Sequence, residues 1–366
     1  MIPYGRQTID EKDIAAVVKV LKSDWLTQGP KVLEFETALA KYCGAKYAVV
    51  ASNGTAALLL AYLAGGIKKG DEVITTPNTF VATSNMLLVL GARPVFCDIR
   101  LDTYNIDESK IEKLITKKTK AIVPVHFGGQ PVALDVIRKI ARRHKLLVIE
   151  DACHSLGAKY KNKKIGSISD MTVFSFHPVK SIATGEGGAV LTNDKNVYHQ
   201  LKLLRSHGIT KDAKGFNVMT ELGHNFRLTD IQAALGISQL KKINQFVAKR
   251  RLLVKKYQQR LKGIDQIILP QEIKGNFSSW HLYVIRTKKA SDRLPLYNYL
   301  LSKGVGVNFH YPAVYSQPYY RRHRYQKTKL ENDELYTKTA ITLPLFPTLR
   351  DRDHQYVCNQ IKNFFN

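Results

Sequence analysis

Short apolar runs alternate with longer amphipathic stretches between about residues 45 and 195. The runs have the length of buried strands: KYAVVAS, DEVITTP, ARPVFCDI, KAIVPVHF, KLLVIEDA, MTVFSFH and GAVLTND. Between them, residues 56–66, 107–116 and 131–145 have helical spacing, and Asp107 is a suitable cap for the second of these helices. This alternation predicts an α/β fold with a mostly parallel central sheet between two layers of helices.

The pattern changes after residue 195. Residues 228–261 form one long helical region, with Thr229 or Asp230 as its cap, and beyond it short strands (278–287 and 304–311) mix with helices (293–304 and 354–365). Such a mixture is typical of a compact α+β unit. We therefore predict a large domain over residues 1–245, including the N-terminal segment, and a smaller C-terminal α+β domain over residues 246–366.

Composition and length fit a globular protein. The 366 residues are 44% hydrophobic and 23% charged, which argues against disorder or a fibrous repeat. The opening MIPYGRQTIDEKDI has no secretory pattern, and we find no apolar stretch of the roughly 18 residues that a spanning helix needs. We expect a cytoplasmic protein without a membrane partner. The cysteines lie far apart without CxxC spacing, so we expect neither a disulfide nor a metal site: Cys43, Cys97, Cys153 and Cys358.

The formal net charge of +26 raises the question of a nucleic-acid partner. The basic residues occur in short groups over the whole chain, with neither a basic arm nor a nucleic-acid motif. We therefore favour a solvated basic surface and expect no nucleic-acid partner. Such a surface would also attract a small anionic substrate.

Two residues sit where an open parallel sheet places its ligands. Asp151 ends the run LLVIED, at the expected carboxyl edge of a central strand. Its carboxylate could pair with a protonated ring nitrogen, or it could only cap the turn that follows. Both interpretations remain open. Lys180 lies between an apolar run and a glycine-rich turn, in FSFHPVKSIATGEGGAV. A partly desolvated amine there could act as a nucleophile, although most lysines are surface groups.

Other segments near the same edge could contact a cofactor. The turn Ser52-Asn53-Gly54 leads into a helix whose N-terminus could bind a phosphate, with Ser175 close by. Phe80, after a strand and a proline turn, could lie on a flat ring or belong to the core. Asn225 and Arg227 precede a helix, where polar groups either contact anions or only organise the loop.

Taken together, these segments resemble the DegT/DnrJ-type sugar aminotransferases, a family of fold-type I enzymes that depend on pyridoxal 5′-phosphate (PLP). The resemblance covers nearly the whole chain in order. It is carried by IPYGRQ, SDWLTQGP, SNGTAAL, DEVITTPNTFVAT, FCDIRLDTYNID, VIEDACHSLGA, FSFHPVKSIATGEGGAV, GHNFRLTDIQAALG, VNFHYPAVYSQPYY and TLPLFPTL.

The resemblance implies roles around PLP. Lys180 would be the catalytic residue that holds the cofactor covalently, Asp151 would pair with the pyridine nitrogen, and Phe80 would stack on the ring. His154 matches a position that faces the ring. The phosphate would be held by Gly54, Thr55, Ala56 and Ser175. In the family an asparagine of the neighbouring subunit completes this site, and Asn225 stands in the matching segment, so a homodimer is expected.

A narrower similarity, in MIPYGRQ, SDWLTQGP and FSFHPVKSIATGEGGA, is to the branch of the family that acts in pseudaminic acid synthesis. It implies transfer of an amino group from L-glutamate to the C4 keto group of a UDP-linked 2-acetamido-2,6-dideoxy-hexos-4-ulose. The residues that would contact this substrate are Tyr4, Trp25, Thr27, Gln28, His310 and Tyr311.

Three alternatives remain open from the sequence. The enzyme could act on another UDP- or dTDP-linked 4-keto-6-deoxy sugar. It could be a dehydratase of the same fold, although those relatives carry histidine in place of the lysine; here Lys180 is present and His177 lies three residues earlier. The chain could also be a non-catalytic basic binding protein, which the retained Asp151, Lys180, Ser175 and Phe80 argue against.

Overall fold

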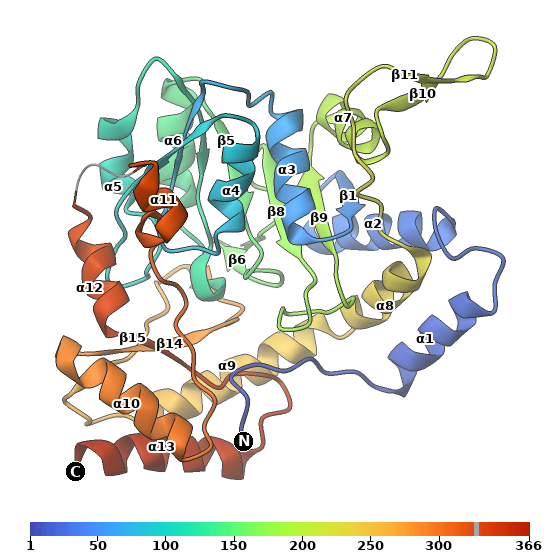
Figure 1. Cartoon of the computed structure of the whole chain (residues 1–366). Coiled ribbons are helices and arrows are strands. Elements are labelled where there is room, and N and C mark those ends of the chain that lie inside the picture. The colour runs from blue at the N-terminus through green and yellow to red at the C-terminus, as the bar shows by residue number, and fades with distance from the viewer. Residues whose placement is uncertain (326–328) are drawn as a thin grey trace.

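A seven-stranded sheet forms the centre of the computed structural model, which describes residues 1–325 and 329–366 (Figure 1). Its strand order is β1-β9-β8-β5-β4-β2-β3. The strands are β1 (Tyr47–Ala51), β2 (Glu72–Thr75), β3 (Arg93–Phe96), β4 (Thr119–Val123), β5 (Leu147–Asp151), β8 (Met171–Ser175) and β9 (Gly188–Thr192). Six of them fall within predicted apolar runs, and β4 begins one residue before its run. Only β9 runs opposite to the other six strands, so the predicted mostly parallel sheet is confirmed.

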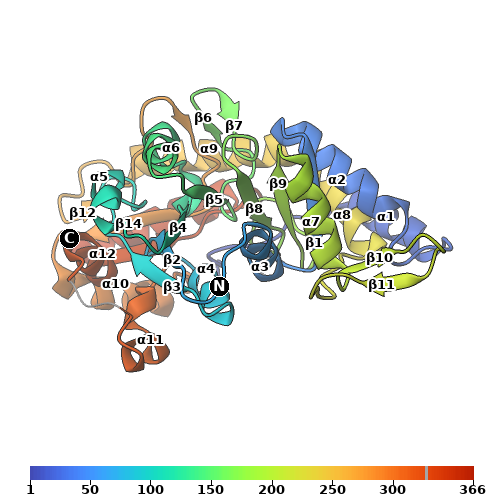
Figure 2. The same cartoon turned by 90° about the horizontal axis from the view of Figure 1, so that it is seen from above.

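Alternate residues of each strand pack on opposite faces of this sheet. In β1, Val50 joins the core under one helical layer and Val49 joins the core under the other. One layer contains α2 (Pro30–Cys43) and α6 (Leu134–Arg143); the other contains α3 (Gly54–Ala64), α4 (Ala82–Val89) and α7 (Lys195–Arg205). Figure 2 shows these two layers on opposite sides of the strands. Burial on both faces explains why the strands are apolar throughout.

The predicted helix over residues 107–116 is shorter than expected. The α-helix α5 covers only Glu108–Ile111 and passes into a 3-10 turn, Glu112–Leu114. Asp107 does cap it, since its carboxylate accepts a hydrogen bond from the Ser109 N–H at 3.1 Å. The helix ends early because Ile115 is already extended and the chain must turn into β4 at Thr119.

The long helical region predicted over residues 228–261 consists of two helices. They are α8 (Asp230–Leu240), which Thr229 caps, and α9 (Ile243–Arg260). At the break, the Lys242 ammonium group bonds to the buried Asp13 carboxylate at 2.6 Å. Asp13 belongs to α1 (Glu11–Leu21), which packs against α8. This tertiary contact ties down the junction, and helical periodicity alone does not reveal it.

A second, antiparallel sheet lies in the C-terminal part, with strand order β12-β14-β15: β12 (Ile267–Ile268), β14 (Tyr283–Thr287) and β15 (Ala340–Leu343). Its core includes side chains of α9, α10 (Ala290–Ser302) and α13 (Asp351–Phe365). Two shorter helices complete this part, α11 (Pro318–Arg322) and α12 (Glu331–Thr339). This arrangement is α+β, as predicted, while the division at residue 245 stays a prediction.

The prediction of a strand over residues 304–311 is wrong. This segment makes only single bridges, from Val305 to Ile2 and from Asn308 to Thr342. Gly306 lies so close to the N-terminal segment that an added Cβ would be 2.8 Å from the Ile2 carbonyl oxygen. The segment is therefore fixed by the N-terminus of the chain rather than by a regular strand pair.

Smaller elements lie at the periphery. A β10 (Ile209–Lys211) and β11 (Asn217–Met219) hairpin projects from the body beside α7 (Figure 1), and β6 (Lys159–Tyr160), β7 (Lys163–Lys164) and β13 (Asn276–Phe277) form a small third sheet. All four cysteines are free thiols. Among the described residues, none of the helices combines the length and apolar character needed to cross a membrane.

Candidate active site

Asp151 lies at the carboxyl end of β5, where the parallel strands β4, β5 and β8 end together. Its side chain is buried, with 5% exposed. One carboxylate oxygen accepts a hydrogen bond from the Thr83 hydroxyl at 2.6 Å, and the other accepts one from the Cys153 N–H at 3.2 Å. These two hydrogen bonds fix the orientation of the carboxyl group at the strand edge, where it can pair with a cationic group in the site.

Lys180 lies in the loop that joins β8 to β9, and its backbone N–H donates to the His177 carbonyl at 2.8 Å. Burial lowers the pKa of its ammonium group, while the nearby Cys153 and Asp151 act in the opposite direction. Within residues 1–325 and 329–366, no carboxylate lies within ion-pair distance of its Nζ. A desolvated amine without a salt bridge is more readily deprotonated and becomes a better nucleophile.

The N-terminus of α3 lies against the end of β8. An added Cβ on Gly54 would be 2.8 Å from the Ser175 Cβ, so only glycine allows this approach. Asn53 caps the helix by accepting a hydrogen bond from the Ala56 N–H at 2.8 Å. The first N–H groups of a helix have no partner within it and can bind an anion. The structure thus brings Gly54, Thr55, Ala56 and Ser175 together.

His154 and Tyr311 form a hydrogen-bonded pair in the site. The Gly128 N–H donates to His154 Nδ1 at 3.3 Å, and Nε2 lies 3.2 Å from the Tyr311 hydroxyl. Burial holds the pKa of His154 well below its usual value, so the ring is neutral. Because Nδ1 accepts a hydrogen bond, the proton of the neutral ring is on Nε2. The Nε2–H group then donates a hydrogen bond to the Tyr311 oxygen. The Tyr311 hydroxyl keeps its own proton, since burial raises its pKa.

Two further histidines surround Lys180. The ring of His281 lies 4.4 Å from that of His154, and His310 bonds through Nδ1 to the Thr342 hydroxyl at 2.9 Å. Burial lowers the pKa of His281 well below its usual value and that of His310 to about 3, and the positive charge of Lys180 acts in the same direction for both. Tyr4 joins this group, with its ring 5.3 Å from His310.

Phe80 and Asn225 are accessible at the edge of the site. Phe80 is 58% exposed, and its ring lies 6.2 Å from that of Tyr311. Asn225 is exposed and its backbone pairs with Ser206, beside the Phe226 carbonyl that accepts from the Ser52 N–H at 2.8 Å. Both side chains are therefore open to solvent in this chain, and their predicted contacts with the cofactor stay predictions.

Trp25, Thr27 and Gln28 lie apart from this group, on the loop between α1 and α2. Thr27 forms a bridge to Thr229, and the Gly29 N–H donates to the Asp230 carboxylate at 2.7 Å. These hydrogen bonds and that from the Lys31 N–H to Asp230 join the loop to the start of α8. The roles predicted for these three residues stay predictions.

The sequence reasoning missed Thr83, Asn78 and His281. Thr83 orients Asp151, and Asn78 accepts a hydrogen bond from the Tyr311 N–H at 3.2 Å. Both flank Phe80 in TTPNTFVAT, and the position of Thr83 three residues after Phe80, at helical spacing, could have indicated it. For His281 we find no local signal, because a contact between distant segments places it.

These residues fit PLP. The cofactor needs a carboxylate at its pyridine nitrogen, an amine at its aldehyde carbon and donors at its phosphate. Asp151, Lys180 and the cradle of Gly54 and Ser175 offer these groups from the ends of adjacent elements. The close approach of Gly54 to Ser175 is the most specific of these features, because a side chain at residue 54 would close the cradle.

Comparison with known proteins identifies the family of this chain. Residues 7–362 match the model of the DegT/DnrJ/EryC1/StrS aminotransferase family. The chain belongs to this family. It is 41% identical to the UDP-4-amino-4,6-dideoxy-N-acetyl-beta-L-altrosamine transaminase of Campylobacter jejuni subsp. jejuni, over 98% of this chain and 96% of that protein. It is 38% identical to the spore coat polysaccharide biosynthesis protein SpsC of Bacillus subtilis, over 99% and 96%.

Among solved structures, Helicobacter pylori PseC superposes with a TM-score of 0.96. It is described as an aminotransferase involved in the biosynthesis of pseudoaminic acid, is 37% identical, and the match covers 100% of this chain and 99% of PseC. The predicted family, fold class and enzyme class are confirmed: this is a sugar aminotransferase. PLP, the predicted cofactor, is the cofactor of DegT-family aminotransferases.

Proposed function

We propose that this aminotransferase moves an amino group from L-glutamate to the C4 keto group of a UDP-linked 2-acetamido-2,6-dideoxy-hexos-4-ulose. The 41% identity with the C. jejuni transaminase over nearly the whole chain supports this substrate. One structural observation carries the reaction type: the desolvated Lys180 amine and the buried Asp151 carboxylate lie at one edge of the sheet, beside the cradle of Gly54 and Ser175.

PLP supplies an electron sink when it is bound. Lys180 would hold the cofactor through its amine, and the same amine would take up and return the proton at the substrate carbon. The low pKa that burial imposes on Lys180 suits a base that must accept and return this proton. The Asp151 carboxyl group, which accepts hydrogen bonds from the Thr83 hydroxyl and the Cys153 N–H, would pair with the ring nitrogen.

We assign a role in substrate binding to the uncharged side chains of His154, His310 and Tyr311, which lie beside Lys180. The Tyr311 hydroxyl accepts from His154 and can donate its own proton to a sugar or keto oxygen. Tyr4 and His310 lie next to it. Because burial lowers the pKa values of His154 and His310, both rings offer hydrogen bonds without adding positive charge.

A homodimer fits the exposure of Asn225 and Phe80. Asn225 is exposed in its own protomer, as a residue that completes the phosphate site of a partner would be. A cytoplasmic location fits an enzyme that uses glutamate and a nucleotide sugar.

The first experiment is an absorbance spectrum of the protein with added PLP, before and after L-glutamate. We expect a visible band for lysine-bound PLP that glutamate bleaches and the UDP-4-keto sugar restores. Lys180→Ala should lose this band and lower turnover by about 10²- to 10⁴-fold. Lys69→Ala, at an exposed lysine far along the chain from Lys180, is the control and should behave as wild type.

Substrate choice is tested by comparing the UDP-linked keto-sugar with a dTDP-4-keto-6-deoxy sugar as amino acceptor. A higher kcat/KM with the UDP substrate supports the proposal, whereas preference for the dTDP sugar would assign the enzyme to another branch of the family. Full activity in Lys180→Ala would overturn the mechanism. Absence of any PLP band would favour a non-catalytic protein.

A further inference from the structure

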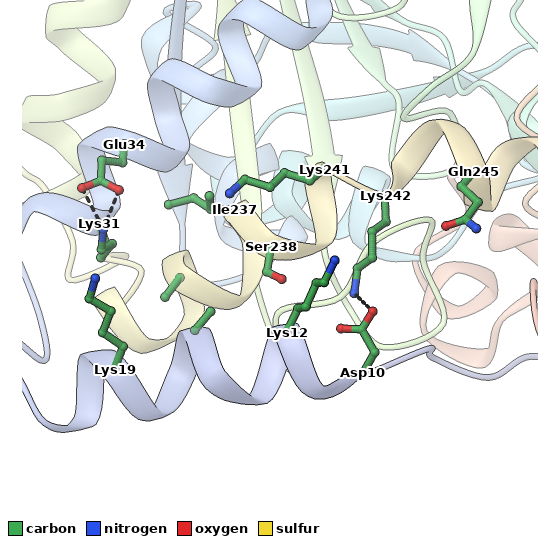
Figure 3. Close-up of a pocket in the computed structure, with 12 residues that line it drawn as sticks. Asp10, Lys12, Lys19, Lys31, Glu34, Ile237, Ser238, Lys241, Lys242 and Gln245 are labelled. Atoms are coloured by element: carbon green, nitrogen blue, oxygen red, sulfur yellow. Dashed lines mark hydrogen bonds and ion pairs between the residues drawn. The ribbon is translucent and has the colours of Figure 1, made fainter.

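A hollow of about 570 Å³ lies between α1 and α8, away from Lys180 (Figure 3). We call it the lysine groove. Five lysines line it: Lys12, Lys19, Lys31, Lys241 and Lys242. Opposed to them are the carboxylates of Asp10 and Glu34, so the lining carries a formal charge of +3. No step of the proposed aminotransferase reaction uses these residues.

The ammonium groups in the groove differ in their partners. Lys242 bonds to Asp10 at 2.9 Å and to Asp13 at 2.6 Å, and Lys31 bonds to Glu34 at 2.6 Å. Across residues 1–325 and 329–366, Lys12, Lys19 and Lys241 have no ion pair. The positive charge of the groove is therefore concentrated on these three side chains.

The backbone explains why the three side chains line the same hollow. Lys12 and Lys19 are seven residues apart on α1 and so share one face of that helix, while Lys241 follows the last turn of α8, which packs against α1. Figure 3 shows the side chain of Lys12 extending from α1 toward α8, and that of Lys241 extending along α8 toward Ile237. Like charges that share a hollow repel one another, and an anion held between them relieves this repulsion.

We infer that the lysine groove binds a small diphosphate-bearing anion. A lining with a formal charge of +3 attracts the two to three negative charges of a diphosphate more strongly than the single charge of a carboxylate. Ala16, Ala234 and Ile237 give the groove an apolar wall on which a nucleoside ring could lie. Free pyrophosphate and a nucleoside diphosphate share this chemistry, and the experiment separates them.

The groove is distinct from the cofactor site. Gln239 lies between them: its Nε2 donates to the Asp13 carboxylate at 2.6 Å and to the Thr8 carbonyl at 2.9 Å, and its Oε1 accepts from the Ala183 N–H at 3.4 Å. Ala183 belongs to the loop that carries Lys180. Buried side chains thus separate the groove from the position of PLP.

Isothermal titration of the PLP-loaded enzyme with inorganic pyrophosphate at low ionic strength tests the inference, since bound PLP already fills its own phosphate cradle. We expect saturable binding of one anion per chain, weakened by added salt. Lys12→Ala and Lys241→Ala should each weaken binding about tenfold, the effect of losing one charge-assisted contact. Lys255→Ala, at an exposed lysine of α9 outside the groove, is the matched control.

Absence of saturable binding would overturn the inference, as would an equal loss in Lys255→Ala, which would indicate diffuse attraction to a basic surface. UDP and uridine are titrated alongside. If Lys12→Ala weakens UDP binding and UDP binds more tightly than pyrophosphate, the occupant is a nucleotide; the reverse order assigns free pyrophosphate. All three variants should keep wild-type transamination and thermal unfolding, so failure here is separable from failure of the proposed aminotransferase function.

Discussion

The chemistry of the site depends on which single side chains are buried and which donors they meet. Asp151 was recognisable in the sequence because a carboxylate at the end of an apolar run is costly to bury without a partner. The partner, Thr83, became clear only in the structure, where its hydroxyl reaches the carboxylate at 2.6 Å. It comes from α4, on a segment 68 residues away.

Replacing Thr83 tests how much this hydrogen bond contributes to catalysis and to PLP binding. Thr83→Val keeps the shape but removes the donor, so the Asp151 carboxylate loses a charge-assisted hydrogen bond of about 1.5–3 kcal/mol. We expect kcat/KM to fall by about 10- to 100-fold and PLP to dissociate more readily, measured by steady-state kinetics and by PLP titration. Thr83→Ser, which retains the hydroxyl, should restore most activity. An equal loss of kcat/KM in Thr83→Val and Thr83→Ser would indicate that Thr83 acts through packing and not through its hydrogen bond.

The pKa of Lys180 provides a second test at this scale. Burial lowers it from its usual value, so in the PLP-free enzyme the neutral amine should persist to lower pH than in a solvated lysine. Asp151 acts to raise the pKa of Lys180; removing that charge in Asp151→Asn should therefore lower it further.

Amine labelling as a function of pH, read for each peptide by mass spectrometry, measures this effect. The labelling midpoint of Lys180 should move to lower pH in Asp151→Asn, with the exposed Lys255 as the internal reference in the same spectra. A midpoint that moves upward would show that Asp151 does not act on Lys180 through its charge.

Among the elements, the start of α3 matters most to the site. Asn53 caps this helix through the Ala56 N–H, and the same turn lies against Ser175 through Gly54. The sequence predicted a helix entering at about Thr55, because a small-residue turn followed an apolar run. It did not reveal that Gly54 is needed for contact with β8, since that requirement comes from a strand that lies about 120 residues further along the chain.

Asn53→Ala should affect both stability and cofactor binding. Loss of the cap costs about 1 kcal/mol and loosens the turn that presents Gly54 and Thr55. Asp194→Ala is a matched control, because Asp194 caps α7 by accepting from Asn196 and Val197, away from the site. We expect similar shifts in the urea midpoint of both variants but weaker PLP binding only in Asn53→Ala. Weaker binding in both would point to a general loss of stability.

Hydrophobic periodicity predicted helices and strands well where the local pattern agrees with burial. It predicted them poorly where a contact with a distant segment determines the local structure. The strands of the sheet fall in the predicted apolar runs because burial on both faces demands such runs. By contrast, the break between α8 and α9 depends on Asp13 of α1, and the irregular segment at 304–311 depends on Ile2. The cluster of His154, His281 and His310 likewise joins segments that the sequence keeps apart.

In the molecule as a whole, the apolar surface of α1 supports assembly. Ile14, Val18 and Leu21 occur at helical spacing but are 47%, 39% and 55% exposed, so this stripe faces away from the core. The β10–β11 region adds Phe216, which is 67% exposed. A pattern of this kind predicts a buried helix face from the sequence, and only the structure shows that the chain itself does not cover it. The proposed homodimer would cover this stripe, and it would also explain the exposed Asn225.

Val18→Glu combined with Leu21→Glu should convert a dimer into monomers, because burying two carboxylates in an apolar interface without partners is strongly unfavourable. Sedimentation velocity measures the change, and Lys22→Glu, an exposed charge reversal beside the stripe, is the control. If the partner completes the phosphate site, the monomer should also bind PLP more weakly while retaining its Lys180 loop. A double variant that stays dimeric would place the interface elsewhere, and a monomer with unchanged PLP affinity would show that each chain builds its phosphate site alone.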